Sequence, residues 1–131
     1  MPGNPLLLSI VELGGYPDYA PLYRRLGFEV EQVTSMRKAL ALLKKRSPQV
    51  VVAEFNFQSD FRDRSSSLES LLATLQSRAP DARMVVFYEE EYEGPFRERL
   101  ASRWPIHAAL PFPVDETRLE AAIVSAGGAH D

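Results

Sequence analysis

Two acidic residues stand where predicted strands end, and they are the first candidates for chemistry. Glu12 follows the apolar run Leu6–Val11, and Glu54 ends the run Val50–Ala53. With an oxygen of Asn56, these carboxylates could hold a hard cation such as Mg²⁺, which prefers several oxygen ligands. So small a ligand set implies weak metal binding at most, and we expect no cofactor. The alternative is a pair of structural carboxylates with local hydrogen bonds.

Other catalytic chemistries find little support in the sequence. The chain has no cysteine, which excludes disulfides, thiolate nucleophiles and cysteine–zinc sites. His107 and His130 form no metal motif, and we interpret His107 as a packed strand residue. The serine run 65–67 has no histidine partner for a hydrolase triad, and Gly14-Gly15 lacks the spacing of a phosphate loop. We therefore expect no enzyme activity.

The distribution of charge excludes a second group of functions. The net charge is −3, and an acidic run spans Glu89 to Glu93. We interpret this run as a solvated loop that shares an edge of the sheet with Asp60 and Asp63. Such a rim repels phosphates, and an acidic chain is a poor nucleic-acid binder. The basic run Lys44-Lys45-Arg46 suits the carboxyl end of a helix and needs no nucleic acid to explain it.

The length and hydropathy of the chain indicate one domain and no membrane association. At 131 residues it fits a single domain over 1–131, with about 5–127 ordered. No Lys or Arg precedes the run Leu6–Leu8, as a secretory signal would require, and no run reaches the ~18 apolar residues that cross a bilayer. We expect a cytoplasmic protein of bacterial type.

Apolar runs alternate with helix-like segments along the whole chain. The five runs are Leu6–Val11, Phe28–Val33, Val50–Phe55, Met84–Tyr88 and Ile106–Leu110. Strict alternation predicts parallel strands, because parallel neighbours need crossover connections. The predicted fold is therefore α/β: a doubly wound five-stranded parallel sheet, a flavodoxin-like (βα)5 three-layer sandwich. Charges in Phe28–Val33 mark an edge strand.

Capping residues set the expected helix ends. We expect helices at about 18–26, from Ser35, after Ser66, from Gly94 to Trp104, and after Asp115. Gly27 is placed to end the first helix. Tyr16, Tyr19 and Tyr23 near that helix are interpreted as packing residues. The polar segment 56–67 is expected as a long loop over the carboxyl edge of the sheet.

Three segments resemble the receiver domain of two-component response regulators, the domain of chemotaxis regulators and phosphorelays. Ala108–Asp115, followed by Leu119 and Ile123, is similar to the fifth strand, the lysine-proline-phenylalanine turn and the last helix of that family. Ser47–Glu54 is similar to the strand that ends on the phosphorylated aspartate, and Leu26–Val30 to the entry of the second strand. The resemblance covers nearly the whole chain.

The resemblance also implies that the phospho-acceptor site is degenerate. Glu54 stands where the family has its aspartate, and Glu12 keeps at most one of the acid pair that holds Mg²⁺. Tyr88 or Glu89, depending on register, takes the place of the phosphate-binding hydroxyl. Leu110 replaces the lysine, and a leucine cannot neutralise a phosphoryl group. The resemblance thus points to a pseudo-receiver, in which Glu54 is either a permanent substitute for phosphoaspartate or merely structural.

The resulting hypothesis is a non-enzymatic signalling module that acts through protein–protein contacts. Receivers commonly use the surface of their fourth helix, fifth strand and fifth helix to bind a partner or form a homodimer. Aromatic and arginine residues are enriched at such contacts. Here they are Phe96, Arg97, Arg103, Trp104 and His107. For Trp104 a place in the core is the alternative.

Two other functions stay open at this point. One is a flavodoxin-like domain that binds a small ligand or a cation at the carboxyl edge of the sheet. The other is an atypical phospho-accepting receiver that uses Asp60 or Asp63 of the long loop.

Overall fold

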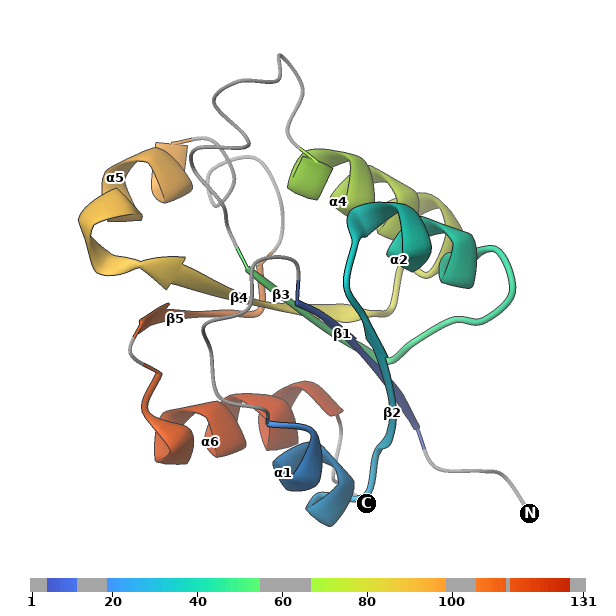
Figure 1. Ribbon diagram of the computed structural model, residues 1–131, viewed down its shortest axis with the longest axis horizontal. Coiled ribbons are helices and arrows are strands. Elements are labelled where there is room, and N and C mark those ends of the chain that lie inside the picture. The colour runs from blue at the N-terminus through green and yellow to red at the C-terminus, as the bar shows by residue number, and fades with distance from the viewer. Residues whose placement is uncertain (1–4, 12–18, 55–66, 99–105, 113, 128–131) are drawn as a thin grey trace.

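A five-stranded parallel sheet forms the centre of the molecule (Figure 1). The computed structural model describes residues 5–11, 19–54, 67–98, 106–112 and 114–127. Its strands are β1 (Leu6–Ile10), β2 (Glu29–Val33), β3 (Val50–Glu54), β4 (Arg83–Glu89) and β5 (Ala108–Phe112), in the order β2-β1-β3-β4-β5. Every neighbouring pair is parallel. The predicted doubly wound sheet is confirmed.

Helices cover both faces of this sheet. They are α1 (Ala20–Arg25), α2 (Met36–Leu43), α4 (Ser67–Arg78), the 3-10 turn η1 (Glu90–Tyr92), α5 (Glu93–Phe96) and α6 (Glu116–Gly127). In Figure 1, α1 and α6 lie on one face, and α2, α4 and α5 lie on the other. Within the described ranges, no helix is both long and apolar enough to cross a membrane.

The core is divided by the sheet into two clusters. Val51 and Ala53 of β3 pack toward α2 and α4, whereas Val50 and Val52 pack toward α1 and α6. Both clusters are needed because side chains alternate between the faces of a strand. A strand that is covered on both faces is apolar without alternation, which explains the continuous run Val50–Ala53.

Capping residues define three helix ends as the sequence predicts. The Ser35 Oγ accepts a hydrogen bond from the Lys38 amide at 3.1 Å, and the Asp115 Oδ1 accepts one from the Thr117 amide at 2.9 Å. Gly27 follows α1 with φ +100°, a conformation that residues with a Cβ rarely adopt. The expected cap Ser66 lies outside the described residues.

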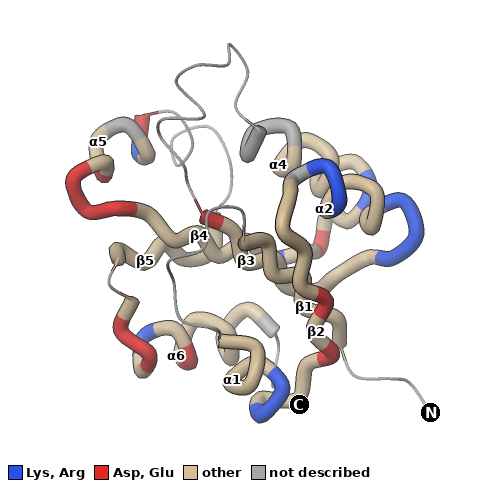
Figure 2. Tube along the Cα trace, in the orientation of Figure 1, with Lys and Arg blue, Asp and Glu red and all other residues tan. Residues whose placement is uncertain are grey.

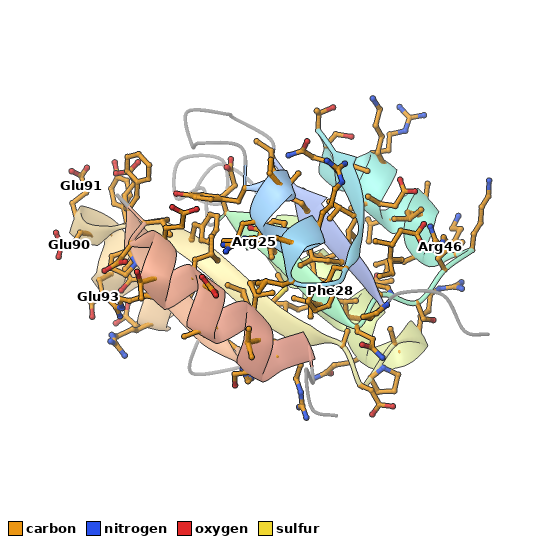
Figure 3. All side chains as sticks on the ribbon, turned by 90° about the horizontal axis from the view of Figure 1, so that it is seen from below. Arg25, Phe28, Arg46, Glu90, Glu91 and Glu93 are labelled. Atoms are coloured by element: carbon orange, nitrogen blue, oxygen red, sulfur yellow. The ribbon has the colours of Figure 1, made fainter. Side chains whose placement is uncertain are left out.

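The edge strand β2 is held to the turn after α2 by one arginine. Arg46, which is labelled in Figure 3, donates to Glu29 through both terminal nitrogens, at 2.9 and 3.0 Å, and also approaches Glu31 at 3.4 Å. The hydrogen bonds from Arg46, with its charge, lower the pKa of Glu29. Arg46 therefore differs from Lys44 and Lys45, with which the sequence groups it. Its partners are 17 and 15 residues away along the chain.

The last strand begins later than expected, and this corrects the interpretation of His107. The structure starts β5 at Ala108, so Ile106 and His107 precede it. The side chain of His107 is exposed, and its Nε2 lies 3.0 Å from the Ser125 Oγ of α6. Its backbone amide donates to the Met84 carbonyl at 2.8 Å, which leads the chain into β5. His107 is a surface residue and not a packed strand residue.

Candidate functional site

Three strands place Glu54, Phe87 and Leu110 in one row across the carboxyl half of the sheet. Glu54 is opposite Phe87 in the pairing of β3 with β4, and Phe87 is opposite Leu110 in the pairing of β4 with β5. Phe87 and Leu110 belong to the cluster beneath α1 and α6, as do Val50 and Val52. Glu54 shares their face, because every second residue of a strand does. We call these three residues the Glu54 row.

The Glu54 row is almost completely buried. Glu54 is 6 % exposed, Phe87 6 % and Leu110 5 %. Burial of a carboxylate is costly unless it is hydrogen-bonded or paired, and Glu54 does have interactions within the fold. The other two members of the row are apolar, so they supply neither a hydroxyl nor a positive charge.

Tyr88, one of the two residues expected at the hydroxyl position, points to the opposite face. It packs in the cluster beneath α2, α4 and α5, where its ring stacks on Phe96 with centroids 4.9 Å apart and an interplanar angle of 6°. The other candidate, Glu89, is exposed at the end of β4. A shift of one residue moves a side chain to the other face of a strand. The residue of β4 directly opposite Glu54 is Phe87, which the sequence analysis did not single out.

A small pocket surrounds the Glu54 carboxylate. Its lining residues come from β1, β2, β3, β4 and the start of α1: Ser9, Ile10, Val11, Tyr19, Tyr23, Gln32, Val52, Glu54 and Phe87. The space open to the centre of a water molecule is about 20 Å³. That volume holds a water, but it is far below a typical small-molecule site.

Aromatic rings form one wall of this pocket. The Tyr19 ring meets Phe87 edge-on, with centroids 6.0 Å apart and an interplanar angle of 74°. Tyr23 is 2 % exposed and packs in the same cluster. Burial, with a smaller contribution from the negative charge of Glu116, raises the pKa of Tyr19. The packing predicted for these two tyrosines is what the structure has, although the sequence did not place them beside Glu54.

The remaining candidates for a cation site lie outside the described residues. These are Glu12 and Asn56. The alternative phospho-acceptors Asp60 and Asp63 also lie outside the described residues. Within the described part of the chain, no three His, Cys, Asp or Glu side chains lie close enough to hold a metal ion. The proposed ligand set of Glu12, Glu54 and Asn56 therefore remains a prediction.

The predicted interface residues divide into buried and exposed ones. Phe96 is 2 % exposed and stacks beneath α5, so it cannot anchor a partner in this structure, and this expectation is wrong. Arg97 is exposed and forms an ion pair with Glu93, Nη2 to Oε2 2.8 Å, one helical turn away. His107 is also exposed. Arg103 and Trp104 lie outside the described residues.

Solved structures of receiver domains share this fold. A response regulator receiver protein from Sinorhizobium medicae WSM419 superposes with a TM-score of 0.73 at 18% identity, covering 98% of both chains. A sensor protein from Polaromonas sp. JS666 gives 0.67 at 26% identity, covering 93% of this chain and 94% of that one.

A third structure contains the modified residue itself. A response regulator from Burkholderia pseudomallei with a phosphorylated aspartic acid gives a TM-score of 0.62 at 21% identity, covering 94% of this chain and 69% of that one. No family model and no curated protein matches the sequence, so the likeness is structural. The chain has the fold of a response-regulator receiver domain.

Proposed function

We propose that this chain is a cytoplasmic, non-enzymatic signalling module: a receiver-like domain that has lost phospho-acceptor chemistry and acts through protein–protein contacts. The observation that supports the loss is the Glu54 row. In receivers, the resemblance implies, an aspartate, a hydroxyl and a lysine act together at this end of the sheet. Here Glu54, Phe87 and Leu110 lie in one row across that end of the sheet.

Charge explains why this row is unsuited to accept a phosphoryl group. A transferring phosphoryl group develops negative charge, which a positioned cation or hydrogen-bond donor must stabilise. The side chains of Phe87 and Leu110 carry neither, and both are buried. The pocket beside Glu54 has room for about one water. A phosphorylated Glu54 would therefore lack both neutralisation and space.

Glu54 itself fits a fixed role better than a reactive one. An ionised glutamate carries a negative charge at the place where receivers acquire one by phosphorylation. The rings of Phe87, Tyr19 and Tyr23 pack around this part of the sheet, and this packing does not depend on phosphorylation. The module is then set in one state and does not switch by phosphorylation at this residue.

The proposed contact surface is formed by α5, β5 and α6. Arg97 and His107 are its exposed members on α5 and before β5. Val124 of α6 is 38 % exposed, the only large apolar side chain so exposed among the described residues. Exchange of Arg97 and Arg103 for glutamate should leave the fold intact and abolish partner capture or homodimer formation at this surface.

A mass measurement tests the loss of phospho-acceptor chemistry. The protein is incubated with Mg²⁺ and acetyl phosphate, and its intact mass is recorded before and after brief exposure to base. We expect no base-labile phosphoryl adduct. A stoichiometric adduct contradicts the proposal, and peptide mapping then decides between Glu54 and the loop residues Asp60 and Asp63.

A restored site provides the matched positive control. The variant Glu54→Asp/Phe87→Thr/Leu110→Lys places an aspartate, a hydroxyl and a cation in the same row. Circular dichroism first checks that this variant folds. We expect its phosphoryl adduct to exceed that of the parent chain, because each change supplies one missing group.

A further inference from the structure

The helix α2 carries a stripe of positive charge on its solvent-facing side. The stripe consists of Arg37, Lys38, Lys44 and Lys45, all of them exposed. Lys44 and Lys45 extend the helical turn, since their amides donate to the Ala41 and Leu42 carbonyls at 3.3 and 2.9 Å. At 3.6 residues per turn the four side chains fall within about a third of the helix circumference. We call this set the basic stripe.

Two of the four residues of the basic stripe lie where the helix dipole disfavours positive charge. Lys44 and Lys45 lie at the carboxyl end, where the helix dipole favours cations. Arg37 and Lys38 lie in the first turn, where the dipole disfavours them, and that turn has no acidic residue. Residues that break a local rule without a structural gain are expected at functional surfaces. The arrangement therefore points to an anionic partner along the whole helix.

An exposed group of acidic residues lies on the other side of the molecule. Glu89, Glu90 and Glu91 are exposed at the end of β4 and in η1, and we call them the acidic turn. Figure 2 shows the positive segments of α2 near the β2 edge of the sheet and the acidic turn toward the β5 edge. The view in Figure 3 agrees: Arg46 marks one end, and Glu90 and Glu91 mark the other.

Several neighbouring charged residues form ion pairs within the chain, so we do not count them as part of these two surfaces. Arg46 binds Glu29 and Glu31 of β2, and Glu93 binds Arg97 of α5. The basic stripe and the acidic turn are thus two separated surfaces of opposite sign in a chain of net charge −3. They do not pair within one molecule, because α2 follows the edge strand β2 whereas the acidic turn follows β4, and β1 and β3 lie between these two strands.

We propose that the basic stripe of one copy binds the acidic turn of a second copy. The contact is heterologous, because the two partners contribute different surfaces. Each copy retains one unused surface of each sign, so association continues head to tail unless the rotation closes a ring. Exposed ion pairs are weak and are screened by salt, so the assembly should be strongest at low ionic strength.

This inference does not depend on the proposed function. None of its residues belongs to the Glu54 row, and association does not require phosphorylation or its loss. A phosphoryl adduct at Glu54 would overturn the proposed function and leave this contact untouched. Conversely, a strictly monomeric chain would overturn this contact and leave the Glu54 row as described.

Sedimentation velocity of the full chain over a range of concentrations tests the contact. We expect a sedimentation coefficient that rises with concentration at about 0.02 M salt and a monomer at about 0.5 M salt, where the Debye length is much shorter. The variant Lys44→Gln/Lys45→Gln should weaken association by about 2-fold to 25-fold, the combined range for two exposed ion pairs. Glu90→Gln/Glu91→Gln should act similarly.

Mixing separates head-to-tail binding from a general charge effect. A chain that lacks the basic stripe (Arg37→Gln/Lys38→Gln/Lys44→Gln/Lys45→Gln) and a chain with Glu90→Gln/Glu91→Gln should each associate more weakly than the parent when alone. Together they should form a 1:1 complex, because each retains the surface that the other lacks. The control Arg24→Gln/Arg83→Gln removes two exposed charges elsewhere and should associate like the parent.

Three outcomes would overturn the proposal. The first is a parent chain that stays monomeric at low salt, and the second is a control that weakens as much as the lysine variant. The third is a mixture of the two variants that does not form the 1:1 complex. Loss of folding is excluded separately, since Arg37→Gln/Lys38→Gln removes an unfavourable dipole interaction and should raise the melting temperature while it weakens association.

Discussion

Phe87 and Tyr88 are neighbours in β4, yet they belong to different parts of the molecule. Phe87 lies opposite Glu54 and meets Tyr19 edge-on, in the cluster beneath α1 and α6. Tyr88 faces the opposite side, where it stacks on Phe96 and joins the sheet to α5. Aromatic side chains thus pack on both faces of the sheet, beside a buried carboxylate on one face and against α5 on the other.

The two faces of the sheet differ in what surrounds their aromatic side chains. On the face of the Glu54 row, apolar rings and a leucine fill the space around the carboxylate. On the face of Tyr88, the same kind of packing connects the core to a helix whose outer side carries exposed charges. The first face is packed around a buried carboxylate, and the second leads to the surface that we propose for partner binding.

The largest effect is expected from removal of the Phe87 ring. Phe87→Ala deletes a buried aromatic ring and leaves a cavity beside Glu54, so unfolding free energy should fall by about 3–5 kcal/mol. Chemical denaturation measures this loss. The control Tyr88→Phe keeps the stack on Phe96 and should cost less than about 1 kcal/mol. If Phe87→Ala stays within about 1 kcal/mol of the parent, the wall beside Glu54 is not tightly packed.

The sequence was sufficient to predict the sheet and its two layers of helices. Continuous apolar runs such as Val50–Ala53 require cover on both faces, and Ser35, Gly27 and Asp115 mark helix ends through interactions with nearby residues. These signals are local, so they are visible in the order of residues. The edge position of β2 follows from its charges in the same way.

The candidate site could be predicted only in part, because its contacts join distant segments. The sequence indicates Glu54 and Leu110, but for the strand between them it leaves two neighbouring residues, Tyr88 and Glu89, as alternatives. Neighbouring residues of a strand point to opposite faces of the sheet, so this choice decides on which face the side chain lies. Arg46 reaches across 17 residues to Glu29, a pairing that no local pattern announces. Phe96 is apolar within a charged segment, which fits an interface anchor and a core residue equally well.

A smaller effect tests whether the Glu54 row acts as a unit. Leu110→Lys places a cation in the cluster beneath α6 and should cost about 2–4 kcal/mol in unfolding free energy, because a buried charge needs a partner. Lysine is long enough to approach Glu54 along the row, so the loss should be greater in the background of Glu54→Gln.

A double-mutant cycle from denaturation curves measures this coupling. We expect about 0.5–3 kcal/mol, the range for residues that interact. As a control, Ala109→Lys places the cation on the opposite face, where its cost should not depend on Glu54. If lysine at 109 and lysine at 110 had equal coupling energies with Glu54, the sheet would not separate the electrostatic interactions of its two faces at this end.

The smallest effect compares the two tyrosines that represent the two faces. Burial raises the pKa of both Tyr19 and Tyr88 above their ordinary value of 10.0, and a nearby carboxylate adds to each shift. For Tyr19 that carboxylate is Glu116 of α6, and for Tyr88 it is chiefly Glu93 of α5. Each face therefore has its own acidic neighbour.

Ultraviolet titration of Tyr19→Phe and Tyr88→Phe, each alone and with one glutamate replaced, separates these pairs. Glu116→Gln should lower the pKa of Tyr19 alone, and Glu93→Gln should lower that of Tyr88 alone. Because a raised phenol pKa favours the folded state only while the proton is held, this stability is full below the unfolded pKa and is lost as pH rises through the folded one. Each glutamine variant should therefore begin to lose stability at the same pH as the parent but lose less of it, because its folded tyrosine pKa lies closer to the unfolded one. A glutamate change that moved both tyrosines equally would mean that the sheet does not separate the two faces.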